Sequence, residues 1–298
     1  MAKRSSLLGN LLVLGLVVIS VLVWQRVYQI YSAPQEKCLE VNFINVGQGD
    51  SILITTPGQK HILIDGGTFP RQWSKFDAGK MVVVPYLKSK HIKKLDLVVA
   101  THPDLDHIGG LIAVLRDIPV DLFLDSGTIS TTQTYEILLR LIDEKNIKFR
   151  IAAPGDISPD PQVTLQVLSP ISPAFKNAPN DNSIVIKVLY GNVSFLLTGD
   201  ITNVAESMYI QKYGEELAVT ILKLGHHGSK SSSSGEFLEY TQPEAAIISC
   251  GRNNPFGHPS PEVIERLDNM DMPSYRTDQQ GTITIKTDGK QYSVYTQK

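Results

Sequence analysis

Histidines and aspartates gather where three apolar runs of the sequence end. Residues 95–100 are followed by the stretch THPDLDHIGG at 101–110, residues 193–198 by Gly199-Asp200, and residues 219–224 by GHHGS at 225–229. Loops on a rigid scaffold are where functional sites are commonly built. A single His or Asp there could be a solvated side chain, and an Asp could cap a helix. The three groups together predict a divalent metal site, because imidazoles and carboxylates are its usual ligands.

The rest of the sequence predicts the scaffold that would position these groups. Alternating or continuous apolar runs predict strands at 39–46, 51–55, 61–64, 95–100, 122–124, 164–169, 183–190, 193–198, 219–224, 245–249, 281–287 and 291–296. Helices are predicted at 81–90 (weakened by Pro85), from 107 to 116, and at 131–145, 205–213 and 261–269. The first three strands are expected to form an antiparallel meander. Strand-rich halves with outer helices predict two packed sheets covered by helices.

Composition bounds the class of protein. The 298 residues carry a net charge of −2, with 42% apolar and 19% charged residues, which is ordinary for one large or two small folded domains. No strongly basic face is evident, so tight non-specific binding of nucleic acid by charge alone is not indicated. Cys38 and Cys250 form neither a disulfide framework nor a zinc finger, and we interpret them as two unrelated thiols.

The N-terminal segment is expected to lie outside this fold. Lys3 and Arg4 precede an apolar run at 7–24, which as a helix would reach about 27 Å, close to the ~30 Å hydrocarbon core of a bilayer. We expect residues 1–34 to be a membrane anchor with a short linker, and residues 35–298 to be one domain outside the cytoplasm. A cleaved signal peptide is the alternative, although the run is long for one.

Seven motifs together resemble those of the metallo-β-lactamase superfamily, whose metal loop reads His-x-His-x-Asp-His. More closely, the chain is similar from about residue 39 onward to the extracellular hydrolase domain of ComEC-type DNA-uptake competence proteins. The matching stretches are NVGQGDS at 45–51, IDGG at 64–67, residues 101–110, NDNS at 180–183, LLTGD at 196–200, HHGSK at 226–230 and GHPSP at 257–261. As an ensemble they are highly specific for the fold and only weakly specific for the substrate.

The resemblance implies an α+β fold of four layers, αββα, with the metals at one edge of the two sheets. By position it also implies metal ligands: His102 and Asp104 for one ion, Asp106 and His107 for the second, and Asp200 for both. One of His226 and His227 would complete the second site. We expect His226 to be the ligand and His227 a phosphate-facing or proton-transferring neighbour, with the opposite assignment nearly as favoured.

Two departures from the superfamily pattern bear on the metal. Asp104 stands where the loop normally has its second histidine, and the superfamily's middle metal histidine is replaced within 180–183. Oxygen-rich sites suit manganese or magnesium better than zinc. We therefore expect one or two divalent ions, manganese first and zinc as the close alternative.

A mechanism follows from the expected site. Divalent ions lower the pKa of a bound water and neutralise phosphate oxygens. Asp106 would orient the water, and His227 or His258 would protonate the leaving oxygen, although His258 could equally be a turn residue before Pro259. Asp65, with the two glycines that follow it, is expected to support the strand end rather than bind metal. The residues expected to contact substrate are Asn182, Ser183, Ser229 and Lys230.

Three functions remain open from the sequence. The leading hypothesis is a phosphodiesterase, a nuclease acting on extracellular DNA during competence-type uptake beside a separate channel protein, since one anchor cannot form a DNA channel. The second is a hydrolase of another phosphoester, a cell-wall substrate, a carboxylic ester or a lactam, the lactam being disfavoured by Asp104. The third is a non-catalytic module that binds nucleic acid or a partner, against which the intact Asp106, His107, Asp200 and His226 argue.

Overall fold

The computed structural model describes residues 14–28, 38–69, 76–171 and 178–298. The chain divides into two units, Met1–Lys37 and Cys38–Lys298. In the first unit residues 14–28 are helical. Across the described residues no helix combines the length and apolarity needed to cross a bilayer. The spanning helix expected at 7–24 is therefore not supported, and its first part, 7–13, lies outside the described residues.

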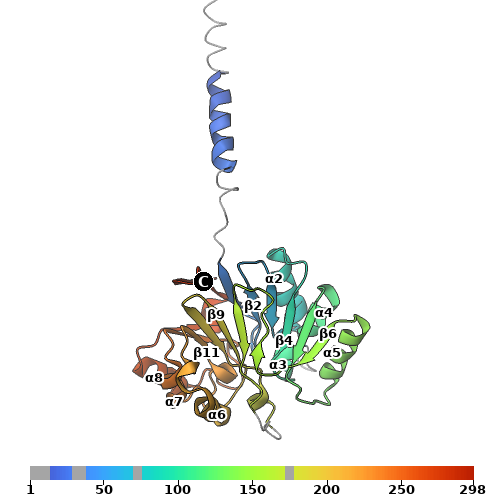
Figure 1. Cartoon of the computed structure of the whole chain (residues 1–298), viewed down its shortest axis with the longest axis vertical. Helices are drawn as coiled ribbons and strands as arrows, with labels where there is room; N and C mark the ends of the chain where they lie inside the picture. The colour runs from blue at the N-terminus through green and yellow to red at the C-terminus, as the bar shows by residue number, and fades with distance from the viewer. Residues whose placement is uncertain (1–13, 29–37, 70–75, 172–177) are drawn as a thin grey trace, which may run out of the picture. The chain divides into compact units, whose positions relative to one another are not determined.

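Two β-sheets form the centre of the second unit (Figure 1). Among the described residues, the first sheet has eight strands in the order β15-β14-β1-β2-β3-β4-β5-β6 and the second has seven in the order β13-β12-β11-β10-β9-β8-β7. The first comprises β1 (Leu39–Phe43), β2 (Ile52–Thr55), β3 (His61–Ile64), β4 (Leu97–Ala100), β5 (Leu122–Asp125), β6 (Lys148–Ile151), β14 (Ile283–Thr287) and β15 (Tyr292–Thr296). The second comprises β7 (Gly155–Asp156), β8 (Thr164–Val167), β9 (Ile186–Tyr190), β10 (Val193–Leu197), β11 (Ile221–Lys223), β12 (Ala245–Ile248) and β13 (Ser274–Arg276).

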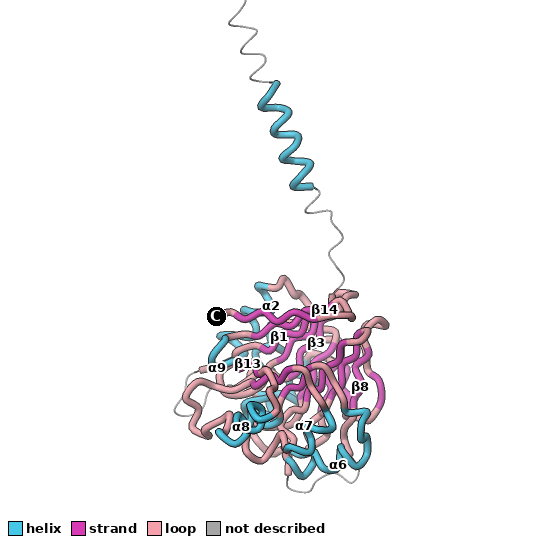
Figure 2. The backbone as a smooth tube through the Cα atoms, turned by 90° about the vertical axis from the view of Figure 1, so that its left-hand side faces the viewer, coloured by secondary structure: helices cyan, strands magenta, loops and turns pink. Residues whose placement is uncertain are grey.

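Helices cover the outer face of each sheet, which confirms the expected two-sheet sandwich. One core cluster lies between the sheets and includes Val41, Ile54 and Phe195. The other face of the first sheet packs against α2 (Val84–Ser89), α4 (Leu111–Asp117) and α5 (Gln133–Glu144). The other face of the second packs against α6 (Asn203–Tyr213), α7 (Gly235–Thr241) and α8 (Pro261–Asn269), which gather on one side of the strands in Figure 2.

The strand sequences explain this burial. In β2, Ile52 and Ile54 face the second sheet and Leu53 faces the helices, as the two-residue period of a strand requires. Strand β4 is buried on both faces, so its sequence LVVA is apolar throughout. Strands β1, β2 and β3 pair antiparallel, and the predicted meander is confirmed.

Parallel pairing places the polar strand ends together. Strands β3, β4 and β5 run parallel, as do β10, β11, β12 and β13 in the other sheet. The carboxyl ends of parallel strands lie at one edge of a sheet, where open α/β sheets bind ligands. The loops after β3, β4, β10 and β11 carry Asp65, the 101–110 stretch, Asp200 and the His226-His227 pair.

Some elements differ from the sequence-based prediction, each for a local reason. Strand β6 was not predicted because all four of its side chains are exposed at the sheet edge, so it lacks apolar alternation. The helix weakened by Pro85 does form, as a π-helical segment, η1 (Gly79–Val83), that continues directly into α2, and Pro85 lies at the start of α2 where the two join. The helix expected from 107 divides into α3 (Leu105–Ile108) and α4 around Gly109-Gly110. Cys38 and Cys250 are unpaired thiols, as expected.

Candidate metal centre

Four buried side chains from four loops converge at this sheet edge. Asp50, His107, Asp200 and His227 each present one potential ligand atom, and these atoms all lie within 4.8 Å of one another. Asp50 precedes β2, and the other three follow β4, β10 and β11. Backbone hydrogen bonds tie the loops together, from Asp50 N to Asp106 O (3.2 Å) and from Ile184 N to Thr101 O (2.9 Å).

Asp65 fixes the orientation of His107. The Nδ1 of His107 lies 2.8 Å from Oδ2 of Asp65, which also accepts the Thr101 hydroxyl at 2.7 Å. An ionised carboxylate only accepts hydrogen bonds, so Nδ1 of His107 carries a proton, and Nε2 is the nitrogen that would offer its lone pair to a metal once it is deprotonated. That Nε2 faces Oδ2 of Asp200 at 3.2 Å. Asp65 thus contacts the nitrogen of His107 that does not face Asp200, and its supporting role stays a prediction.

A backbone carbonyl orients His227 in the same way. Its Nδ1 lies 2.9 Å from the carbonyl oxygen of Ser249, which can only accept, so Nδ1 carries a proton and Nε2 is again the nitrogen that a metal would bind after deprotonation. Nε2 faces Oδ2 of Asp200 at 3.2 Å and Oδ2 of Asp106 at 3.5 Å. His226 and His227 both have left-handed backbones, with φ of 48° and 57°. Such conformations cost about 1–3 kcal/mol each and cluster at functional sites.

His102 lies beside these rings. Its Nδ1 is 3.1 Å from the Thr101 hydroxyl and 3.3 Å from the Ser183 hydroxyl. Its ring centroid is 4.1 Å from that of His107, and its Nε2 is 3.7 Å from Oδ2 of Asp104. The side chain of Asp104 is 47% exposed, whereas that of Asp106 is 23% exposed. The two carboxylates of the 101–110 stretch therefore form the more open side of the site.

The unpartnered atoms of this cluster fit a divalent cation. Among the described residues, buried polar atoms without a hydrogen-bond partner include Nε2 of His102, His107 and His227, and Oδ1 of Asp200. An unsatisfied buried polar group costs about 1–3 kcal/mol, so several in one place require an explanation. Imidazole nitrogens and carboxylate oxygens are together suitable ligands for Zn²⁺ and Mn²⁺. The residues present thus fit the metal that the sequence predicts.

The electrostatics of the cluster also favour a cation. Burial alone would raise the pKa of Asp200, but His107 and His227 hold the pKa of that carboxyl well below its usual value. Burial alone would lower the pKa of His107, but Asp200 and Asp65 hold it well above its usual value. The same opposition, with Asp200 as the main attracting charge, raises the pKa of His227. The negative charge of the carboxylates thus outweighs the effect of burial on both histidines. A metal ion would compete with protons for the same imidazole nitrogens.

Asp50 differs from the other members because a lysine neutralises it. Nζ of Lys223 lies 2.7 Å from Oδ2 of Asp50 and donates to the carbonyl oxygens of Gly199 and Leu224. Both side chains are buried. Lys223 shares the face of Ile221 in β11, so it lies between the sheets at their edge. The available signal for this pair in the sequence was a lysine inside the apolar run 219–224, and Lys223 was not among the predicted site residues.

The two adjacent histidines occupy different places. His227 is fully buried in the ligand cluster, whereas His226 is only partly buried, and its ring lies 6.1 Å from the ring of His227 and 5.6 Å from that of His258. The geometry therefore favours the second of the two assignments that the sequence left open, with His227 facing the metal position and His226 facing outward toward His258.

The four residues expected to contact substrate lie around the site in different environments. Ser183 is buried and its hydroxyl accepts the Asp200 N–H at 3.1 Å, so it holds the loop that carries Asp200. Asn182 donates through Nδ2 to the Ala178 carbonyl at 3.3 Å. The Ser229 hydroxyl is 3.0 Å from that of Ser231, and Lys230 is exposed. Of the four, Lys230 is the one with an exposed side chain.

Comparisons with known proteins agree with this architecture. The family model described as the metallo-beta-lactamase superfamily matches residues 44–252, and the chain belongs to that family. YhfI, a metallo-beta-lactamase fold protein from Bacillus subtilis, superposes with a TM-score of 0.55 at 10% identity, over 84% of this chain and 100% of its own. CmlA, a diiron beta-hydroxylase from Streptomyces venezuelae, gives a TM-score of 0.55 at 12% identity, over 84% of this chain and 54% of its own.

Curated relatives are competence proteins of the ComEC type. ComE operon protein 3 of Bacillus subtilis is 34% identical over 98% of this chain and 38% of its own length. Competence protein ComA of Neisseria gonorrhoeae is 30% identical over 86% of this chain and 33% of its own. Recombination protein 2 of Haemophilus influenzae is 33% identical over 76% of this chain and 26% of its own. The chain thus spans well under half the length of these relatives.

Proposed function

We propose that this protein is a metal-dependent phosphodiesterase that cleaves extracellular DNA in connection with competence-type uptake. The observation that carries the proposal is the convergence of two oriented imidazoles, His107 and His227, whose Nε2 atoms both face Oδ2 of Asp200, with the ring of His102 beside that of His107. The family supports metal-dependent hydrolysis, and the competence relatives support nucleic acid as the substrate class. An acidic cluster that can hold cations is also what an anionic phosphodiester needs at its point of cleavage.

We propose a set of ligands for two metal ions that would lie on either side of Asp200. His102 and Asp104 would hold one ion, Asp106, His107 and His227 would hold a second, and Asp200 would contact both. His227 replaces His226 in this set because of its burial and its oriented Nε2. A bound divalent ion would make water more acidic and neutralise charge on the phosphoryl oxygens. Manganese is proposed first and zinc second, because the site of His102 and Asp104 is rich in oxygen.

The chain's own residues would perform the remaining steps. Asp65 keeps the lone pair of His107 on Nε2, and Ser249 does the same for His227. Asp106, at the open side of the site, would orient the attacking water and accept its proton. Proton transfer to the leaving oxygen was expected from His227 or His258, and the burial of His227 in the ligand cluster leaves His258 as the candidate, with His226 beside it.

We further propose that residues 1–34 attach the catalytic domain to the outer face of a membrane, where a separate channel protein would take up the strand. The apolar run at 7–24 and the basic residues before it support this proposal. Proteolysis of intact cells followed by immunoblotting tests it. Loss of the domain from intact cells is expected, and protection of the domain until lysis would overturn the topology.

The test of the activity uses the full chain purified in mild detergent without added metal. Bound metals are measured by mass spectrometry, and hydrolysis of single-stranded DNA, double-stranded DNA and bis(p-nitrophenyl) phosphate is followed with manganese or zinc. Metal-dependent DNA cleavage that is lost in Asp106→Ala and Asp200→Ala is expected. Cleavage of the small diester but not of DNA would move the substrate to another phosphoester. Absence of both metal and cleavage would leave a binding module.

A further inference from the structure

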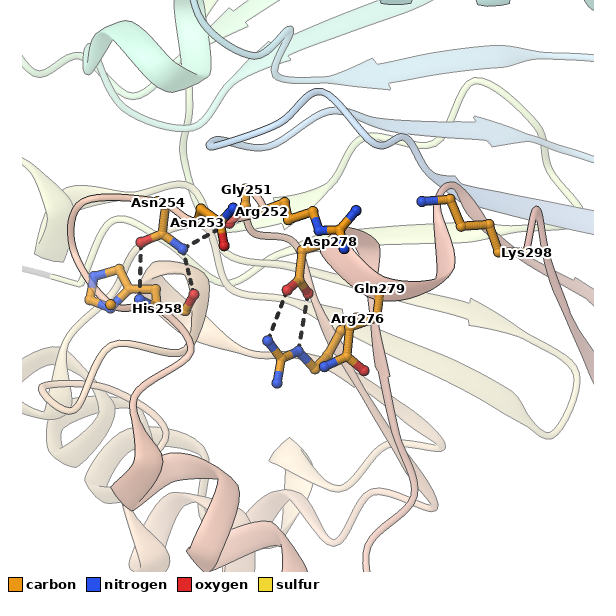
Figure 3. Close-up of a pocket in the computed structure, with 10 residues that line it drawn as sticks. Gly251, Arg252, Asn253, Asn254, His258, Arg276, Asp278, Gln279 and Lys298 are labelled. Atoms are coloured by element: carbon orange, nitrogen blue, oxygen red, sulfur yellow. Dashed lines mark hydrogen bonds and ion pairs between the residues drawn. The ribbon is translucent and has the colours of Figure 1, made fainter.

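A polar pocket of about 660 Å³ opens beside the metal centre (Figure 3). One wall is the loop after β12, which carries Arg252, Asn254 and His258, and another is the segment of Arg276 and Asp278. The cationic side chains that line the pocket are Arg252, Arg276 and Lys298, against the single carboxylate of Asp278. The pocket is therefore positively charged next to a site rich in aspartates.

The loop of this pocket is held in place by Asn254. The Nδ2 of Asn254 donates to the carbonyl oxygens of Gly251, at 2.9 Å, and His258. Its Oδ1 accepts the backbone N–H of His258 at 3.0 Å and that of Phe256 at 3.2 Å. Because one side chain closes the loop from both ends, the pocket wall is fixed before any ligand arrives.

The two arginines of the pocket differ in the contacts of their guanidinium groups. Arg276 forms two parallel hydrogen bonds with Asp278, from Nε at 3.1 Å and from Nη2 at 2.9 Å, which fix it, while its Nη1 has no hydrogen-bond partner among the residues that the structure describes. Arg252 is exposed, and within the described part of the chain its guanidinium has no hydrogen-bond or ion-pair partner. An oriented and a free guanidinium in one pocket match the oxygens of a phosphate, which arginine binds through its planar fork.

The same loop connects the pocket to the ligand cluster. The Gly251 N–H donates to Oε1 of Gln48 at 3.1 Å, in the loop that carries Asp50. The Ser260 N–H donates to the Gly228 carbonyl at 2.8 Å, in the turn that carries His227. His258 lines the pocket while its ring lies 5.6 Å from that of His226. The pocket loop is thus hydrogen-bonded to both the segment that carries Asp50 and the turn that carries His227.

We infer that this pocket is a phosphate subsite, which holds a phosphate of a polynucleotide chain next to the one at the metal centre. The inference deepens the proposed function and rests on it for the scissile phosphate. It makes the substrate class a strand with at least two phosphodiesters, rather than a single diester. Arg252 would provide the free charge, and Arg276 the oriented second contact.

Binding is tested separately from cleavage. A fluorescein-labelled single-stranded octanucleotide is titrated with the full chain in chelator, and anisotropy is recorded at several salt concentrations. Arg252→Ala is expected to weaken binding about tenfold and to lower the slope of log K against log salt by about 0.7, the value for one contact with a single strand. Arg252→Lys should keep most of the slope. Arg140→Ala, an exposed arginine on α5, should bind as the unchanged protein does.

Cleavage then separates this inference from the proposed function. With manganese, Arg252→Ala should lower kcat/KM for the octanucleotide relative to that for bis(p-nitrophenyl) phosphate by about tenfold, mainly through KM. Equal affinity and equal salt slope for Arg252→Ala and the unchanged protein would overturn the subsite, whatever the activity. If no DNA is cleaved but binding depends on Arg252, the subsite stands and the nuclease proposal fails.

Discussion

His107 and Asp65 are joined by a 2.8 Å hydrogen bond between Nδ1 and Oδ2, and both side chains are fully buried. The bond decides which imidazole nitrogen faces Asp200. We expect Asp65→Ala to lower metal affinity about 10–100-fold, the usual effect of losing a carboxylate behind a ligating histidine. Titration with Mn²⁺ monitored by calorimetry measures it. Unchanged affinity in this variant would show that Asp65 only supports the fold.

The two adjacent histidines give a matched pair of variants. His227→Ala should lower metal affinity roughly 100-fold or more, because it removes an oriented Nε2 that faces Asp200. His226→Ala should keep the metal content of the unchanged protein, because His226 lies outside the cluster of converging ligand atoms. Metal content per chain after gel filtration checks both. The reverse pattern would restore the assignment that the sequence favoured.

The buried pair of Asp50 and Lys223 should be strongly coupled. Lys223→Met would leave the Asp50 carboxylate without its 2.7 Å partner, which should reduce the free energy of unfolding by about 3 kcal/mol. The double variant Asp50→Asn, Lys223→Met should lose less than the sum of the two single variants, by about 1–3 kcal/mol. Urea unfolding in chelator measures all four proteins. Additive losses would contradict a direct interaction.

Alanine variants of two glycines with positive φ, Gly49 and Gly155, separate a steric clash from backbone strain. A Cβ at Gly49 would lie 2.1 Å from the carbonyl oxygen of Asp106, at a φ of +124°. Gly49→Ala should displace the Asp106 loop, lower metal-dependent cleavage and cost about 1–3 kcal/mol beyond strain. Gly155→Ala is the control, because Gly155 has a φ of +138° and open space around it. Equal effects of the two variants on cleavage would refute the steric argument.

From the buried carboxyl of Asp125 we predict that the stability difference between Asp125→Asn and the unchanged protein depends on pH. Burial raises the pKa of this carboxyl, despite hydrogen bonds from Gly127 N and the Tyr135 hydroxyl. A folded-state pKa above the unfolded one adds stability at low pH, and this stability is lost as pH rises through the folded value.

Asp125→Asn removes the charge and keeps an acceptor. The variant should therefore gain stability over the unchanged protein at pH 7.5, and this advantage should shrink at pH 4.5. Thermal unfolding in chelator at both pH values measures it, with Asp143→Asn, at an exposed position on α5, as the control. An advantage that is equal at both pH values would contradict the assigned cause.

Much of the fold was predictable because it depends on local patterns. The two-residue period of β1, β2 and β3 and the continuous apolar run of β4 predicted strands that the structure contains. Strand β6 was missed because an exposed edge strand needs no apolar face. Strand β13 (Ser274–Arg276) also gives little signal, because it has only three residues, none of them fully buried.

The sequence by itself determined the family, the two-sheet sandwich and the kinds of side chain at the site, because these depend on composition, periodicity and motif spacing. It could not choose between His226 and His227, because neighbours in sequence can face opposite ways when both adopt left-handed backbones. The contacts of Lys223 with Asp50 and of His107 with Asp65 join segments far apart in the chain. The packing of the two sheets brings Lys223 to Asp50, and the parallel pairing of β3 with β4 brings Asp65 to His107. Tertiary structure therefore decided the geometry of the site.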